Sequence, residues 1–151
     1  MKKIEKYELL FEQLKALINK ESDIIANMSN IVAVIHETFG FWWTGFYRVI
    51  DNELVLGPFQ GPVACTRIAY GKGVCGTSWQ ERKTIVVEDV HKFPGHIACS
   101  SASKSEIVVP LFKEKQVVGV LDIDSENLAT FDSVDKEWLE RIIEFAQPSL
   151  S

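Results

Sequence analysis

The stretch EIVVPLFKEKQVVGVLDID, residues 106–124, holds two apolar segments separated by the charged triplet Lys113–Lys115. Short segments rich in Val and Ile are typical of β-strands, and a brief polar connection between two of them is typical of a hairpin. The stretch therefore predicts two adjacent antiparallel strands, 106–112 and 116–124.

Upstream, the pattern alternates between strand-like and helix-like segments. The expected strands are 41–50, 53–59, 63–68 and 84–88, with Asp51-Asn52 as a hairpin turn between the first two. The expected helices are 3–19, 22–39, 74–82 and 133–146, with Ser22 and Ser133 as N-caps and Gly40 as a stop signal. This order predicts an α+β fold: a central, mainly antiparallel sheet with helices packed on it.

Length and charge limit the function classes. A chain of 151 residues predicts one domain over 1–151, with N-terminal helices in 1–40 and the sheet, an active-site loop and the last helix in 41–151. The net charge of -5 argues against nucleic acid as a partner. The sequence shows neither a signal peptide nor an apolar run long enough to cross a membrane, so no membrane partner and a cytoplasmic location are expected.

The chain has three cysteines, Cys65, Cys75 and Cys99. Cys75 is expected at a helix N-terminus beside Lys72, where the helix dipole favours the thiolate. Cys99 lies in a long irregular segment, 89–105, and loops of that length are often functional. Cys65, in an expected strand, resembles ordinary core. The residues alone leave open whether Cys75 or Cys99 is the reactive thiol, and whether any of the three is more than a small buried apolar side chain.

A metal site is the alternative use of these cysteines. His91, His96 and Cys99 are close in sequence, but the paired C-x-x-C spacing of structural zinc sites is absent. The sequence therefore predicts no metal.

Two further features point to a pocket. Asp122 and Asp124 stand two residues apart on an expected strand, so both carboxyl groups lie on one face of the sheet. They are either a solvated strand end or, in a pocket, acids with raised pKa values that retain a proton. By the same alternation Trp43, Gly45 and Tyr47 share a face, as core or as a ligand wall, and Gly45 is expected to leave a shallow gap for a small ligand.

Several strings together resemble the free methionine-R-sulfoxide reductases, a family with the GAF fold. They are Trp-Thr-Gly-Phe-Tyr (43–47), Ala-Cys-Thr-Arg-Ile (64–68), Gly-Lys-Gly-Val-Cys-Gly (71–76), Phe-Pro-Gly-His-Ile-Ala-Cys (93–99) and Gly-Val-Leu-Asp-Ile-Asp-Ser (119–125). The glycines and the Val-Leu-Asp-Ile strand are common to GAF domains, whereas three cysteines at these spacings are more specific. The resemblance covers about residues 42–125.

The resemblance implies a role for each candidate residue. Cys99 matches the nucleophile, Cys65 the resolving cysteine and Cys75 a third cysteine of the disulfide relay. The acids matched to the sulfoxide oxygen are Glu106, Asp122 and Asp124, and the aromatic walls are Trp43 and Tyr47. The expected substrate-binding set is completed by Gly73, Val74, Cys75 and Ile97, with backbone N–H groups at the helix start expected to hold the carboxylate.

The implied activity is reduction of free methionine-R-sulfoxide through a cysteine sulfenic acid and an intramolecular disulfide. Thioredoxin or a similar dithiol is the implied reductant, and no cofactor is expected. The helix at 3–19 makes a homodimer plausible. The alternative is a GAF module that binds a small ligand without catalysis.

Overall fold

The computed structural model describes residues 1–96 and 102–151. Its helices are α1 (Lys3–Ile18), α2 (Ile24–Phe39), α3 (Gly73–Glu81) and α4 (Ser133–Ala146), with short 3-10 turns η1 (Val90–Lys92) and η2 (Gln147–Ser149). Its strands are β1 (Trp43–Ile50), β2 (Glu53–Gln60), β3 (Arg67–Ala69), β4 (Ile85–Val87), β5 (Ser105–Lys113) and β6 (Gln116–Ser125). Among these described residues, no helix is both long enough and apolar enough to cross a membrane.

The strands form one sheet in the order β3-β2-β1-β6-β5-β4, with every pairing antiparallel. The predicted α+β class is confirmed. Both predicted hairpins form: Asp51 and Asn52 have φ angles of 50° and 65°, and Glu114 and Lys115 have 52° and 68°. Two successive left-handed residues are what a tight two-residue hairpin turn requires.

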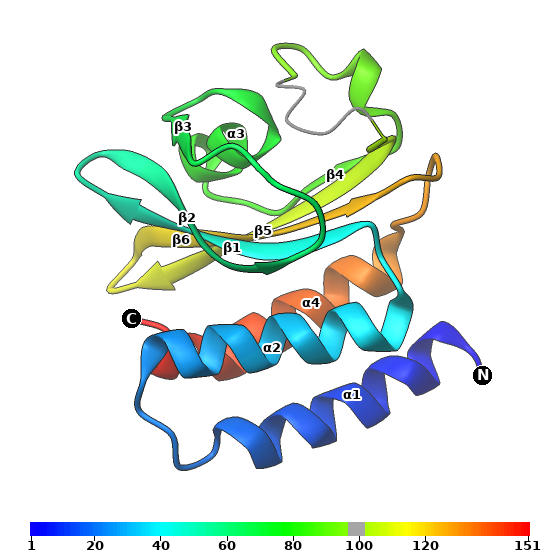
Figure 1. Ribbon diagram of the computed structural model, residues 1–151, viewed down its shortest axis with the longest axis vertical. Coiled ribbons are helices and arrows are strands. Elements are labelled where there is room, and N and C mark those ends of the chain that lie inside the picture. Colours follow the sequence, from blue (N-terminus) through cyan, green and yellow to red (C-terminus); the bar gives the residue numbers. More distant parts are fainter. Residues whose placement is uncertain (97–101) are drawn as a thin grey trace.

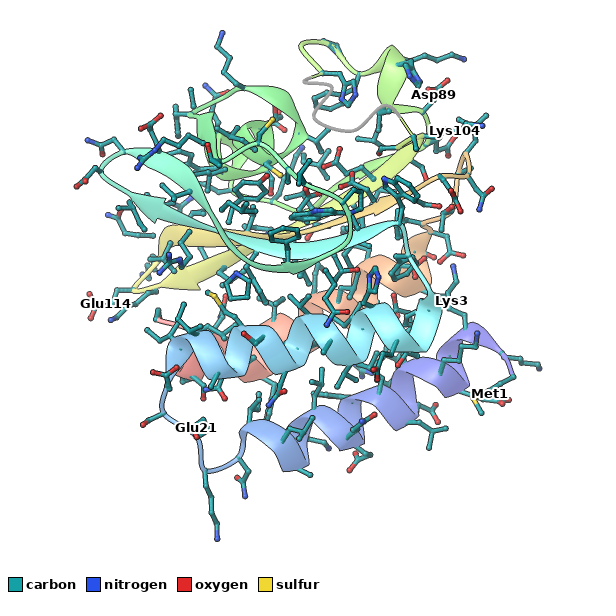
Figure 2. All side chains as sticks on the ribbon, viewed as in Figure 1. Met1, Lys3, Glu21, Asp89, Lys104 and Glu114 are labelled. Atoms are coloured by element: carbon teal, nitrogen blue, oxygen red, sulfur yellow. The ribbon has the colours of Figure 1, made fainter. Side chains whose placement is uncertain are left out.

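The sheet separates two apolar clusters. Helices α2 and α4 lie against one face, with α1 beneath them, while α3 and the connections around it cover the other face (Figure 1). The larger cluster fills the space between the helical layers and the sheet and includes Tyr7, Ile35, Phe46 and Leu121. The smaller one lies under α3 and includes Trp43, Tyr47, Val108 and Val120. The predicted pocket residues belong to this second face.

Some expected boundaries were wrong. The third strand is Arg67–Ala69 rather than 63–68, so Cys65 lies in the β2–β3 connection. The N-caps are Asp23 and Asp132 instead of Ser22 and Ser133, because the aspartate carboxylates accept backbone N–H bonds one residue later or earlier than expected. Helix α2 ends before Gly40, as predicted.

The Asp132 cap yields a stability prediction. Its carboxylate accepts from the backbone N–H groups of Val134 at 2.9 Å and Asp135 at 3.4 Å. The Asp132 backbone N–H donates to the Asp135 carboxylate at 2.9 Å, which completes a capping box. Asp132→Ala should lower the free energy of unfolding by about 1 kcal/mol. Asp132→Asn keeps the acceptor and loses only the exposed Lys3 pair, so it should cost clearly less. Urea unfolding curves of both variants measure the two losses. Equal losses would show that the charge of Asp132 stabilises the helix and that its hydrogen-bond acceptor does not.

Candidate active site

Strand pairing brings the predicted acids together. Glu106 on β5 stands opposite Asp124 on β6, and Asp124 in turn stands opposite Trp43 on β1. Directly opposed residues of antiparallel strands project to the same face, so these three side chains form one row across the sheet. Asp122, paired with Gly45, begins the neighbouring row on that face. Glu106 therefore lies at the Asp122–Asp124 end of the hairpin.

Glu106 and Asp122 are buried, Asp124 is half-buried, and the three carboxyl groups lie against one another. Glu106 is 7% exposed and Asp122 is 6% exposed. The Glu106 side chain is hydrogen-bonded to both Asp122 and Asp124. Within the described part of the chain, Oδ1 of Asp122 is buried and has no hydrogen-bond partner. Two carboxyl groups bond to each other only when one carries a proton, so the cluster holds protons in its folded form.

Electrostatics leads to the same conclusion. Burial raises the pKa of Glu106 well above its ordinary value, and the nearby Asp122 and Asp124 raise it further. Burial also raises the pKa of Asp124 well above its usual range and that of Asp122 above its own. The cluster therefore retains protons at pH values where exposed acids are ionised, and it is not a solvated strand end.

Ser103 and Cys75 border this cluster. The Ser103 hydroxyl donates to Oδ1 of Asp124 at 3.3 Å. Cys75, in the first turn of α3, is a free thiol that is 3% exposed and hydrogen-bonded to Asp122. Burial raises the pKa of the Cys75 thiol well above its ordinary value, and Asp122, Glu106 and Asp124 raise it further. The expectation that the helix dipole makes Cys75 a thiolate was wrong, because burial against three acids outweighs the dipole.

The other two cysteines are placed differently. Cys65 is half-buried in the connection between β2 and β3 and is disulfide-bonded, so its expected place in a strand core was wrong. Cys99 and Ile97 lie outside the described residues. Their predicted roles stay predictions.

Two aromatic side chains form a wall of the pocket. The rings of Trp43 and Tyr47 stack with centroids 6.0 Å apart, and Phe59 stacks on the other side of Trp43 at 5.3 Å. Gly45 does not leave a gap for a ligand: a Cβ there would lie 2.5 Å from both Phe59 Cβ and the Trp43 ring. The glycine instead admits the indole, which lies close over the strand.

A cavity lies between this wall, the acids and α3. The space open to the centres of water molecules measures about 60 Å³, enough for several waters or part of a small ligand. The structure brings eight predicted residues to its lining: Trp43, Tyr47, Gly73, Val74, Cys75, Glu106, Asp122 and Asp124. Burial raises the pKa of the Tyr47 hydroxyl, and the nearby charge of Asp122 raises it further. The hydroxyl therefore keeps its proton and can donate a hydrogen bond.

The lining also contains residues that the sequence reasoning missed as site residues: Val63, Ala64, Ile68, Lys72, His96 and Ser103. Val63 and Ala64 adjoin Cys65, and Lys72 adjoins Gly73, so closeness to predicted residues was the available signal. Partial burial lowers the pKa of His96, and the nearby His91 lowers it further. The lowered pKa favours the neutral imidazole.

One group of described side chains has the geometry of metal ligands. Cys75, Glu106 and Asp122 each offer one ligand atom, all within 4.8 Å of one another. Because burial raises the pKa of all three side chains, a cation would have to displace the protons that they retain.

Comparison with known proteins agrees with this geometry. The family model described as "GAF domain" matches residues 22–147. The chain is 56% identical to GAF domain-containing protein A of Dictyostelium discoideum, over 93% of this chain and 90% of that one. It is 44% identical to the free methionine-R-sulfoxide reductase of Escherichia coli, over 95% of this chain and 87% of that one.

A solved structure is also similar. The free methionine-R-sulfoxide reductase of Neisseria meningitidis, in complex with its substrate, superimposes with a TM-score of 0.98 at 47% identity, over 99% of this chain and 91% of that one. The chain belongs to the GAF domain family and, within it, to the free methionine-R-sulfoxide reductases.

The raised pKa of Glu106 predicts a pH dependence of stability. Because the folded state holds this proton more tightly than the unfolded chain, the stabilising contribution is complete below the ordinary pKa of 4.5 and is lost as the pH rises toward the raised value. Glu106→Gln stays neutral throughout. Its free energy of unfolding should therefore rise relative to the wild type between pH 4.5 and 8, by about 1.4 kcal/mol per unit of pKa shift.

Urea unfolding of the fully reduced protein at several pH values measures this difference. Glu8→Gln, at an exposed position, controls for the loss of one negative charge. A Glu106→Gln difference that stays constant with pH would contradict a protonated Glu106.

Proposed function

We propose that this protein reduces free methionine-R-sulfoxide to methionine by cysteine chemistry. The observation that carries the proposal is the proton-holding cluster of Glu106, Asp122 and Asp124, located in a cavity beside an aromatic wall. A sulfoxide is a poor electrophile until its oxygen is protonated, so its reduction needs an acid at the oxygen and a thiolate at the sulfur. The named relatives support the same substrate.

In this mechanism the acid cluster binds the sulfoxide oxygen and donates the proton. The thiolate of Cys99 attacks sulfur, the oxygen passes to the Cys99 sulfur as a sulfenic acid, and methionine is released. The Cys65 thiol then attacks the sulfenic sulfur, forming the Cys65–Cys99 disulfide and expelling the oxygen as water. The disulfide state of Cys65 and the free thiol of Cys75 support this pairing. Cys75 is the alternative resolving thiol in this scheme.

The rest of the substrate fits the remaining walls. The faces of Trp43 and Tyr47 attract the partly positive sulfur and its methyl group. Lys72, the N-cap of α3, makes no side-chain cap hydrogen bond, which leaves the first N–H groups of the helix for a ligand. Gly73 and Val74 line the cavity at that helix start, so we assign them the substrate carboxylate. Ile97 stays a predicted substrate-binding residue.

The proposed reductant is a protein dithiol such as thioredoxin, and the proposed location is the cytoplasm. Cys65 is half-buried and Val63, two residues before it, is 85% exposed, which supports access of a protein dithiol to this segment. No organic cofactor has a step in this cycle. Helix α1 leaves Leu9 60% exposed and Ile4 47% exposed, which supports a homodimer through this helix.

A coupled assay tests the function directly. With thioredoxin, thioredoxin reductase and NADPH, free methionine-R-sulfoxide should drive NADPH loss. The S-isomer and a peptide-bound R-sulfoxide should drive little, because the carboxylate and amine occupy the closed end of the cavity. Equal rates on a peptide-bound sulfoxide would remove the free-amino-acid assignment, and tight binding without thiol consumption would indicate a ligand-sensing GAF module instead.

The acids are tested by amide variants. Glu106→Gln and Asp124→Asn preserve shape and remove the transferable proton, so each should slow methionine release by about 10²–10⁴-fold. Alkylation of Cys99 by iodoacetamide should continue at the wild-type rate, which separates loss of the acid from loss of the nucleophile. Near wild-type release by both variants would show that the acids are not the proton donors.

A further inference from the structure

The connection between β2 and β3, residues 61–66, is held by the two aromatic residues of the pocket wall. Nε1 of Trp43 donates to the carbonyl oxygen of Pro62 at 3.0 Å. The hydroxyl of Tyr47 donates to the carbonyl oxygen of Cys65 at 2.8 Å. The polar tips of both side chains are therefore bonded to the backbone of the segment that carries Cys65.

These two donors stand on a rigid base. Trp43 is 3% exposed and Tyr47 is 2% exposed, and both project from β1, which is paired on both sides by β2 and β6. A buried N–H or O–H that loses its acceptor carries a desolvation penalty, so each donor favours the position in which the loop carbonyl meets it. The wall thus fixes the loop as well as lining the cavity.

Two more features keep the loop in this path. The backbone N of Leu56 donates to the carbonyl oxygen of Thr66 at 3.0 Å, which fixes the end of the loop next to Cys65. At the other end, Gly61 has a φ of +128°, and a Cβ there would lie 2.7 Å from the Trp42 carbonyl oxygen and 2.8 Å from Trp43 Cδ1. Because Gly61 has no side chain, the backbone of the loop can pass close to the Trp43 indole where it leaves β2.

We propose that Trp43 and Tyr47 are positioning residues for Cys65, whose hydrogen bonds set the rate of disulfide closure. The inference rests on the proposed function, in which Cys65 is the resolving cysteine. In that step the Cys65 sulfur bonds to the Cys99 sulfenic sulfur, the S–O bond breaks and the oxygen leaves as water. The oxidation state of the pair is balanced by the sulfoxide already reduced to methionine.

Disulfide closure depends on placement more than on acidity. Two sulfurs react quickly only when held in a near-attack geometry, and a loop free to sample other positions spends less time there. The Tyr47 bond reaches the carbonyl of Cys65 itself, so loss of its hydroxyl acts on the backbone that places the sulfur. The acid cluster, which serves the preceding step, keeps its own hydrogen bonds to Ser103 and among its members.

Tyr47→Phe is the sharpest test, because it retains the ring that stacks on Trp43 and removes only the hydroxyl. Rapid-quench mixing with one equivalent of free methionine-R-sulfoxide gives two rates in the same sample: methionine release, and decay of the sulfenic acid trapped by dimedone and seen by mass spectrometry. The ratio of closure rate to release rate should fall by about five- to tenfold, the usual effect of one net hydrogen bond. Trp43→Phe, which also loses its N–H donor, should lower the ratio in the same direction.

The matched control is Tyr70→Phe, at a tyrosine that is 52% exposed and packs edge-on against Trp79. It should leave both rates as in the wild type. Cys65→Ser shows the result expected when closure by Cys65 is lost completely. One methionine per enzyme is released, and the sulfenic acid persists until Cys75 or an added thiol removes it.

The outcomes separate this inference from the proposed function. No methionine burst in the wild type would overturn the proposed function. A normal burst with an unchanged rate ratio in Tyr47→Phe, or equal slowing of both steps, would overturn the positioning role alone and leave the reductase assignment in place. Thermal unfolding of each variant confirms that the rates are measured on folded protein.

Discussion

Glu106 and Asp122 are buried and the half-buried Asp124 lies against them, so the folded protein must either keep protons on this cluster or hold several like charges in a medium of low dielectric constant. The pairing of β5 with β6 imposes that choice, because it sets Glu106 directly opposite Asp124. Among the described residues, no lysine or arginine lowers the pKa of any of these three acids. The proton-donating character of the site is thus a consequence of strand register.

The same cluster determines which cysteine is poorly suited to be a nucleophile. Cys75 occupies the helix start that ordinarily favours a thiolate, yet its thiol is buried and bonded to Asp122. A carboxyl group that can protonate a sulfoxide oxygen also raises the pKa of a neighbouring thiol and so disfavours its thiolate. A reductase of this design therefore needs an attacking thiol that is not buried against its acids, whereas Cys75 is.

Local patterns in the sequence were enough to predict the fold class, both hairpins, and the shared faces of Asp122 with Asp124 and of Trp43 with Tyr47, whereas only the family resemblance implied that the acids and the aromatic pair meet in one site. Those features depend on strand alternation and two-residue turns, which neighbouring residues determine. The place of Cys65 outside a strand, the indole filling the space over Gly45 and the raised pKa of the Cys75 thiol were not predicted. The place of Cys65 and the pKa of Cys75 depend on contacts between residues distant in sequence, which no local pattern encodes. The indole lies over a glycine only two residues away, but strand alternation does not set the conformation of the Trp43 side chain. The role of Cys99, and 1–151 as one domain, stay predictions.

The aromatic wall illustrates why those distant contacts matter for chemistry. Trp43 and Tyr47 line the cavity and donate hydrogen bonds from their polar tips to the loop of Cys65, so one pair of side chains contacts both the cavity and the backbone of that loop. Phenylalanine would line the cavity equally well but would leave the loop carbonyls without these donors. The choice of tryptophan and tyrosine, over any apolar ring, is explained by the second contact rather than the first.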